Sequence, residues 1–123
     1  VGVVSGGFHE TVDELADELG LDFVKANHLE VADGKLTGKV VGEVVTKEVK
    51  LASLKKWATE LGLELSQTVA VGDGANDLPM ILASGIGIAF NAKAVVREQA
   101  PYQINTPNLA LALDIIKEVR GDV

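Results

Sequence analysis

The chain has 123 residues, of which 47% are hydrophobic, and it contains no cysteine. The net charge of −7 and the sequence pI of about 4.7 argue against a nucleic-acid partner, because nucleic acids need a positive field. No apolar run is long enough to cross a bilayer, and the 123 residues show no signal-peptide pattern. The lack of cysteine excludes disulfides and thiolate metal sites, and we expect a cytoplasmic protein with no membrane partner.

The predicted elements of the first half begin with an apolar strand over residues 1–4. Because this strand begins with Val1 instead of Met, we expect the chain to be a piece of a longer protein. The spacing then predicts the following elements: a tight turn at Ser5-Gly6-Gly7, a helix over 8–19, a strand over 23–26 and a hairpin over 28–40 around Asp33-Gly34.

In the second half of the chain, the spacing of apolar residues predicts an alternation of helices and buried strands. The expected elements are a helix over 49–61, a strand over 68–71, a helix over 78–84, a strand over 86–90, a helix over 93–99, a strand over 102–104 and a closing helix over 109–119.

This alternation indicates an α/β fold, with a doubly wound, Rossmann-like parallel sheet and a β-hairpin flap. We expect one domain over residues 1–123. In such sheets ligands bind beyond the carboxyl ends of the strands. Ser5-Gly6-Gly7 and Gly72-Asp73-Gly74 both follow predicted strands, so we expect them to contribute to one site.

The loop over residues 72–77 carries two carboxylates four positions apart, Asp73 and Asp77. Mg²⁺ prefers oxygen ligands and commonly takes one or two carboxylates plus a substrate phosphate. We expect Asp73 to be a metal ligand and Asp77 to be a ligand or a group that orients Asp73 or a metal-bound water. Asn76 can donate to a phosphate oxygen. The alternative is that these residues only form a turn and cap the next helix.

Two further features suggest binding of an anion. Ser5 offers a hydroxyl, and Gly6 and Gly7 offer backbone N–H groups. The alternative for Ser5-Gly6-Gly7 is an ordinary turn in which Ser5 caps the helix. Lys50 opens the helix predicted over 49–61 and is placed to neutralise a phosphate, with Lys47, Lys55 and Lys56 as competing candidates.

We expect no functional role for the two histidines, because neither has a neighbour at metal-ligand spacing. His9 is expected on a helix surface and His28 in the hairpin. Trp57 is expected to pack in the core.

The order of these motifs resembles the haloacid dehalogenase-like phosphohydrolase superfamily. The match is carried by the strand with Ser5 and Gly6, by Lys50, and by Gly72-Asp73-Gly74-x-Asn76-Asp77. The segments VSGGF, LEVADGKLTG, TVAVGDGANDLPM and GIGIAFNAKAVVREQA are similar to those of the phosphoserine phosphatase family within it.

The resemblance implies Mg²⁺-dependent hydrolysis of O-phospho-L-serine to L-serine and phosphate through an aspartyl-phosphate. It implies that Ser5 and Gly6 bind the transferring phosphoryl group and that Lys50 pairs with its charge and with the nucleophile. Asp73 would bind Mg²⁺, Asn76 would contact the phosphate, and Asp77 would support the metal shell.

The family's first motif, D-x-D-x-[TV], is not found in the 123 residues. It supplies the nucleophilic aspartate and the acid/base aspartate, and the family places its strand at the centre of the sheet. We therefore expect a partial core that lacks this central strand, that is inactive alone, and that requires the amino-terminal portion of its parent protein.

Three alternatives remain at this stage. A P-type ATPase phosphorylation-domain fragment carries a similar G-D-G-x-N-D string, although Ser5-Gly6-Gly7 and the hairpin favour the phosphatase. A non-catalytic module could retain Mg²⁺ and phosphate binding without a nucleophile. A sugar-phosphate phosphatase is disfavoured, since the residues between Ser5 and Lys50 leave no room for a large cap.

Overall fold

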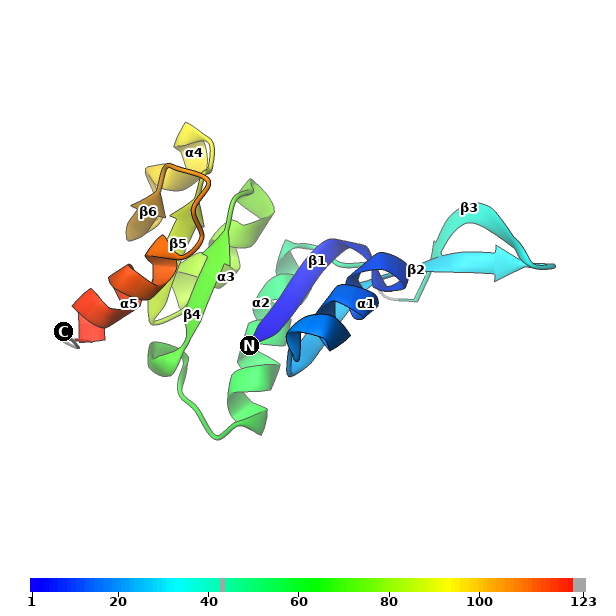
Figure 1. Cartoon of the computed structure of the whole chain (residues 1–123), viewed down its shortest axis with the longest axis horizontal. Coiled ribbons are helices and arrows are strands. Elements are labelled where there is room, and N and C mark those ends of the chain that lie inside the picture. Colours follow the sequence, from blue (N-terminus) through cyan, green and yellow to red (C-terminus); the bar gives the residue numbers. More distant parts are fainter. Residues whose placement is uncertain (43, 121–123) are drawn as a thin grey trace. The chain divides into compact units, whose positions relative to one another are not determined.

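The computed structural model describes residues 1–42 and 44–120, which divide into two compact units, Val1–Ser53 and Leu54–Val123. Each unit contains a three-stranded sheet (Figure 1). The expected α/β class is confirmed. Among the described helices, none combines the length and the apolar character needed to cross a membrane.

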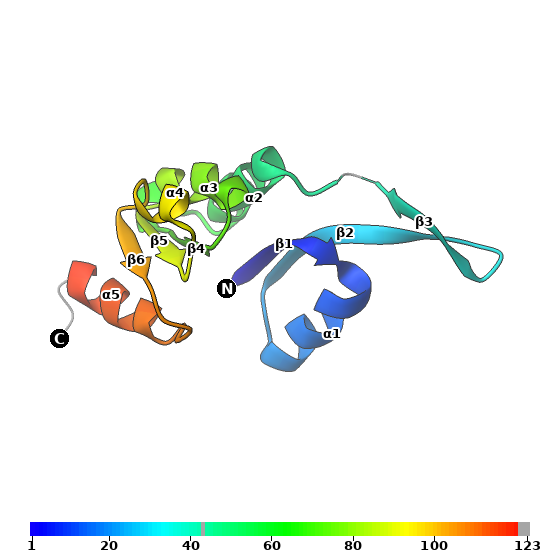
Figure 2. The ribbon, with the colours of Figure 1, turned by 90° about the horizontal axis from the view of Figure 1, so that it is seen from above.

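The first unit has the sheet order β1-β2-β3. Strand β1 (Gly2–Phe8) pairs in parallel with β2 (Phe23–Ala32), and helix α1 (His9–Leu19) connects them and packs on both strands (Figure 2). Gly20 ends α1 in the left-handed region at φ 67°, as the sequence predicted.

The predicted hairpin is confirmed. Strand β2 pairs antiparallel with β3 (Lys35–Val41), and Ala32 lies opposite Lys35. Asp33 and Gly34 form the two-residue turn, both at positive φ (52° and 74°), as a type I′ turn requires. The strand expected over 23–26 and the first hairpin strand are one continuous strand, β2.

The tight turn predicted at Ser5-Gly6-Gly7 is wrong, because β1 continues in extended conformation to Phe8. Val4 lies opposite Lys25 and Phe8 opposite Asn27, so β1 uses four steps where β2 uses two. The extra residues form a bulge, which glycine tolerates well. Ser5 is not a helix cap either, since α1 begins after Phe8 without a side-chain cap.

The boundary between the units falls inside α2 (Lys47–Glu60). The Oγ1 of Thr46 accepts the backbone N–H of Val49 at 3.3 Å and so caps this helix. The helix begins two residues earlier than predicted.

The second unit contains three parallel strands in the order β4-β5-β6. Its elements are η1 (Leu65–Gln67), β4 (Val69–Gly72), η2 (Ala75–Asp77), α3 (Leu78–Ala83), β5 (Ile86–Phe90), α4 (Ala94–Arg97), β6 (Tyr102–Ile104) and α5 (Leu111–Arg120). The predicted bounds of β5 and β6 are confirmed.

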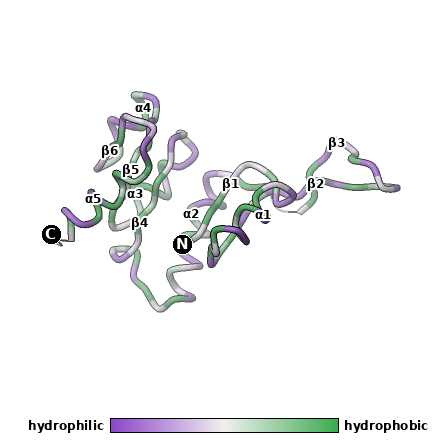
Figure 3. Tube along the Cα trace, in the orientation of Figure 1, coloured by the Kyte–Doolittle hydropathy of each residue, from purple (hydrophilic) through white to green (hydrophobic). Residues whose placement is uncertain are grey.

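Helices cover both faces of this sheet, with α5 on one side and α3 and α4 on the other (Figure 2). Strand β5 is apolar along its length (Figure 3), and it sends Ile86 and Ile88 toward Ala112 of α5. On the other face, Ala89 packs with Ile81 and Val96. This doubly wound arrangement is the one the sequence predicted.

Candidate functional site

Ser5 and Gly6 lie in the bulge of β1, where the pairing with β2 is irregular. The Oγ of Ser5 accepts the backbone N–H of Gly7 at 2.9 Å. A hydroxyl that accepts one hydrogen bond keeps its own O–H as a donor. Gly6 is exposed, and a Cβ added there would meet nothing within 4 Å. The segment therefore offers a hydroxyl donor beside an open stretch of backbone.

Asn27 holds this bulge, and sequence reasoning missed it. Its side chain is buried, at 7% exposure. The Nδ2 of Asn27 donates to the carbonyl of Gly6 at 3.0 Å, and its Oδ1 accepts the backbone N–H of Val45 at 2.7 Å. Asn27 thus joins the bulge to the loop that leads into α2. No sequence signal marked it, because Asn27 lies between the strand predicted over 23–26 and the hairpin predicted over 28–40.

Lys50 lies one turn inside α2 and is buried, at 7% exposure. The competing candidates Lys47, Lys55 and Lys56 are all exposed. Lysine is almost never fully buried without a partner, because removing an ammonium from water is costly. Burial therefore separates Lys50 from the other lysines of the helix.

The loop after β4 is organised by the carboxylate of Asp77. This side chain is 6% exposed, and its Oδ2 accepts the backbone N–H groups of Asp73 and Gly74, each at 3.1 Å. The carboxylate of Asp73 is exposed, as is Asn76. The loop thus fixes its backbone with one carboxylate and presents the other to solvent.

Gly72 is required for this arrangement. A Cβ built on Gly72 would lie 2.4 Å from the Cβ of Asp77 and 2.6 Å from its Oδ2. At Gly74, the same construction would meet the Oδ1 of Asn76 at 2.8 Å. The two glycines therefore let the side chains of Asn76 and Asp77 fold back over the loop.

The donors of this loop fit a hard cation such as Mg²⁺, because they are carboxylate oxygens on a closely defined backbone. Within the part of the chain that the structure describes, no group of three or more His, Asp or Glu side chains is arranged to hold a metal. A cation here would depend on Asp73, with Asp77 in support, and on oxygens of water or substrate.

The predicted site residues fall in both units. Ser5, Gly6 and Lys50 belong to Val1–Ser53, whereas Asp73, Asn76 and Asp77 belong to Leu54–Val123. Within the second unit the three residues share one loop. That the two groups form one site stays a prediction.

The expectation that His9 lies on the surface of its helix is wrong. Its side chain is only 16% exposed and is held by α1 and β2. Its ring also stacks on His28, with the ring centroids 4.2 Å apart. The stacked pair of His9 and His28 is therefore part of the packing within the first unit.

The chain is similar to several known proteins. The sequence model of the haloacid dehalogenase-like hydrolases matches residues 1–82. A curated phosphoserine phosphatase from Streptococcus thermophilus is 70% identical over 119 residues, covering 97% of this chain and 55% of the relative.

Two solved structures are also similar. A probable phosphoserine phosphatase from Vibrio cholerae superposes with a TM-score of 0.92 at 39% identity, covering all of this chain and 39% of the other. A phospho-aspartyl intermediate analogue of phosphoserine phosphatase gives a TM-score of 0.88 at 47% identity, with 94% of this chain and 55% of the other covered. The chain spans about half the length of this Streptococcus thermophilus relative. With two thirds of its residues matched by the family's sequence model, the chain belongs to the haloacid dehalogenase-like hydrolases.

Proposed function

We propose that this chain is the phosphate- and Mg²⁺-binding portion of a cytoplasmic phosphoserine phosphatase. The reaction is hydrolysis of O-phospho-L-serine to L-serine and phosphate. The observation that carries the proposal is the burial of Lys50, the only lysine or arginine that is buried among the side chains that the structure describes, in an acidic chain. The choice of phosphoserine as substrate is supported by the names of the relatives.

Lys50 is proposed to neutralise the phosphoryl group and the attacking carboxylate. Phosphoryl transfer spreads negative charge over three equatorial oxygens, and catalysis depends on positioned positive charge. A buried ammonium acts more strongly than an exposed one, because less water screens it. The hydroxyl of Ser5 and the backbone of Gly6 are proposed to donate to the same group.

Asp73 is proposed to bind Mg²⁺ directly, and Asp77 to hold the loop so that Asp73 is correctly placed. When bound, Mg²⁺ supplies positive charge that offsets the charge of the phosphate oxygens. Asn76 is proposed to donate its side-chain amide to a phosphate oxygen. The hydrogen bonds from the backbone of Asp73 and Gly74 to Asp77 support this division of roles.

The nucleophile must come from outside these 123 residues, because no D-x-D motif is present among them. Covalent transfer needs a carboxylate nucleophile, so the chain alone is proposed to bind phosphate without turning over phosphoserine. A non-catalytic module that only binds Mg²⁺ and phosphate remains the second candidate, and the same missing motif favours it.

Titration of inorganic phosphate, followed by ³¹P NMR with and without MgCl₂, tests the proposal on the full chain. We expect Mg²⁺-dependent binding that Lys50→Ala weakens at least about tenfold, the scale of one charge-assisted hydrogen bond. Lys55→Ala, on the same helix but exposed, is the matched control. Equal losses in both variants, or release of phosphate from phosphoserine by the chain alone, would contradict it. Supplying the rest of the parent protein then separates the phosphatase from the module, since only the phosphatase gains turnover.

A further inference from the structure

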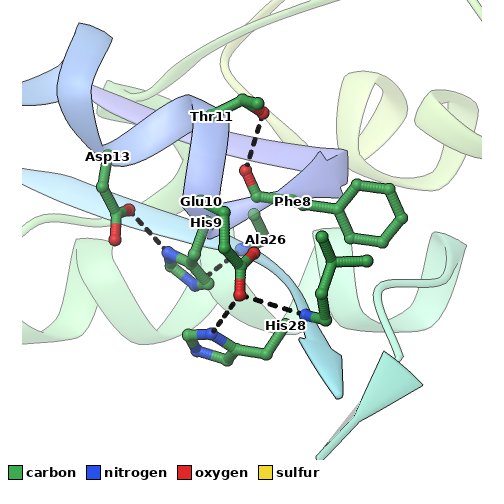
Figure 4. Close-up of polar contacts among 8 residues, drawn as sticks. Phe8, His9, Glu10, Thr11, Asp13, Ala26 and His28 are labelled. Atoms are coloured by element: carbon green, nitrogen blue, oxygen red, sulfur yellow. Dashed lines mark hydrogen bonds and ion pairs between the residues drawn. The ribbon is translucent and has the colours of Figure 1, made fainter. Parts of the chain in front are cut away.

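His9 lies in a group of side chains that connects α1 to β2 (Figure 4). Its Nδ1 lies 2.6 Å from the Oδ1 of Asp13, one helical turn along α1. Its Nε2 accepts the backbone N–H of Ala26 in β2 at 3.2 Å. The ring stacks on that of His28, at an interplanar angle of 18°. The imidazole is thus fixed by contacts at both nitrogens and on one face.

These contacts determine the protonation state of His9. An ionised carboxylate can only accept, so the hydrogen bond with Asp13 places a proton on Nδ1. A backbone N–H can only donate, so the bond from Ala26 requires Nε2 to carry a lone pair. The ring is therefore neutral, in the Nδ1–H tautomer. A proton added at Nε2 would face the N–H of Ala26, and this hydrogen bond would be lost.

The hydrogen bond between His9 and the Ala26 N–H lies next to Asn27, the residue that holds the bulge of β1. Ala26 directly precedes Asn27, which binds the carbonyl of Gly6 and the N–H of Val45. His9 itself directly follows Phe8, the residue opposite Asn27 in the sheet. Loss of the bond to Ala26 would free β2 at the position from which Asn27 reaches Gly6.

We propose that neutral His9 is a positioning residue for the phosphate site at Ser5 and Gly6, and that its protonation weakens phosphate binding in acid. This inference rests on the proposed phosphate site. His9 does not touch the phosphate; it acts through Ala26 and Asn27.

The charged groups that face His9 come from α1 and β2. Asp13 and Glu10 lie on α1 and His28 on β2, with its Nδ1 3.8 Å from the Oε1 of Glu10. Strand β1 carries no titratable side chain. The carboxylates favour a positive charge on the rings, but two charged rings stacked 4.2 Å apart would repel each other. An imidazolium at His9 is incompatible with the bond to Ala26, because its Nε2 would then carry a proton.

Nitrogen NMR of the histidine rings in the full chain tests the tether directly. At about pH 7.5, where an ordinary histidine is neutral, we expect the Nδ1–H tautomer at His9. We also expect slower hydrogen exchange of the Ala26 amide than in His9→Ala. The Nε2–H tautomer, or an Ala26 amide that exchanges equally in both proteins, would overturn the tether.

Phosphate titration with Mg²⁺ at about pH 7.5 and about pH 5.8, on either side of the ordinary histidine pKa, tests the functional link. The comparison is between the natural chain and His9→Gln, whose Oε1 can accept the Ala26 N–H but does not titrate. Phosphate's own protonation affects both proteins equally and cancels. On acidification we expect the natural chain to lose roughly fivefold more affinity than His9→Gln, as for one lost hydrogen bond. His28→Asn keeps the tether and controls for the neighbouring ring.

The two measurements separate failure of the inference from failure of the proposed function. The Nδ1–H tautomer without any phosphate binding at about pH 7.5 would refute the phosphate site, and with it the link from His9. Phosphate binding with equal acid dependence in the natural chain and His9→Gln would refute the link alone.

Discussion

The carboxylate of Asp77 accepts the backbone N–H of Asp73 at 3.1 Å, so one acidic residue of the loop fixes the backbone of the other. Asp77 is buried, whereas Asp73 is exposed. The two carboxylates therefore have different physical tasks. Asp77 contributes to the stability of the loop, and Asp73 is the one presented for a cation.

This difference predicts opposite effects of two substitutions. Asp77→Ala leaves the N–H groups of Asp73 and Gly74 without their acceptor, and we expect a loss of about 1–3 kcal/mol in the free energy of unfolding. Asp73→Ala should leave stability within about 0.5 kcal/mol, as for an ordinary surface change, but should abolish Mg²⁺ dependence of phosphate binding. Urea denaturation followed by circular dichroism measures the first effect, and ³¹P NMR the second. Similar destabilisation by both variants would contradict the assignment.

Gly72 offers a steric test of the same loop. Gly72→Ala would drive a methyl group into the Cβ of Asp77, so the loop must open, at a cost of about 1–3 kcal/mol. Gly6→Ala is the matched control, since its added Cβ meets nothing within 4 Å. Thermal melting of the two variants should separate clearly. A Gly72→Ala variant as stable as Gly6→Ala would show that the loop is not closed over Gly72 in solution.

Much of the second unit could be predicted because local signals agree with tertiary contacts there. The apolar run Ile86–Phe90 is bounded by turn residues and is buried on both faces, so its strand bounds are confirmed. In the first unit, the Asp33-Gly34 turn was predictable from local sequence alone, because its positive φ values need these residue types.

The remaining features depend on partners distant in sequence. Ser5-Gly6-Gly7 has the composition of a turn, and only pairing with β2 makes it a bulge. The burial of Lys50 cannot be read from a helix with four similar lysines. The contact between His9 and Ala26 spans 17 residues, and no local pattern reports it.

Substitution of Asn27 is expected to lower the stability of the fold and to weaken phosphate binding. Asn27→Ala removes the donor to Gly6 and the acceptor for Val45 at a buried position, for an expected loss of about 1–3 kcal/mol. Asn27→Asp keeps an acceptor for Val45 but turns a negative oxygen toward the carbonyl of Gly6. We therefore expect it to weaken phosphate binding, measured by ³¹P NMR, even where the chain remains folded.

The control for Asn27 is Asn105→Ala, because Asn105 is exposed and bonds only to the side chain of Gln103 among the contacts described. Its effect on unfolding should stay within about 0.5 kcal/mol. Equal effects of Asn27→Ala and Asn105→Ala would argue against a bridging role for Asn27.

The lowered pKa of Glu10 leads us to expect that the stability of the first unit depends on pH in acid. Its pKa lies below the ordinary value of 4.5, chiefly through a hydrogen bond from its own backbone. Desolvation opposes this shift, and the hydrogen bond from Leu29 and the charges of His28 and His9 add to it by smaller amounts. A carboxyl whose pKa is lower in the folded state stabilises the fold above its unfolded value, and this contribution disappears as the pH falls through the folded value. We therefore expect Glu10→Gln to lower the urea midpoint at neutral pH. The difference from the natural chain should shrink as the pH falls below 4.5. Glu14→Gln, on the same helix and exposed, is the control. A midpoint difference that stays constant as the solution is acidified would show that the ionised form of Glu10 is not what holds Leu29.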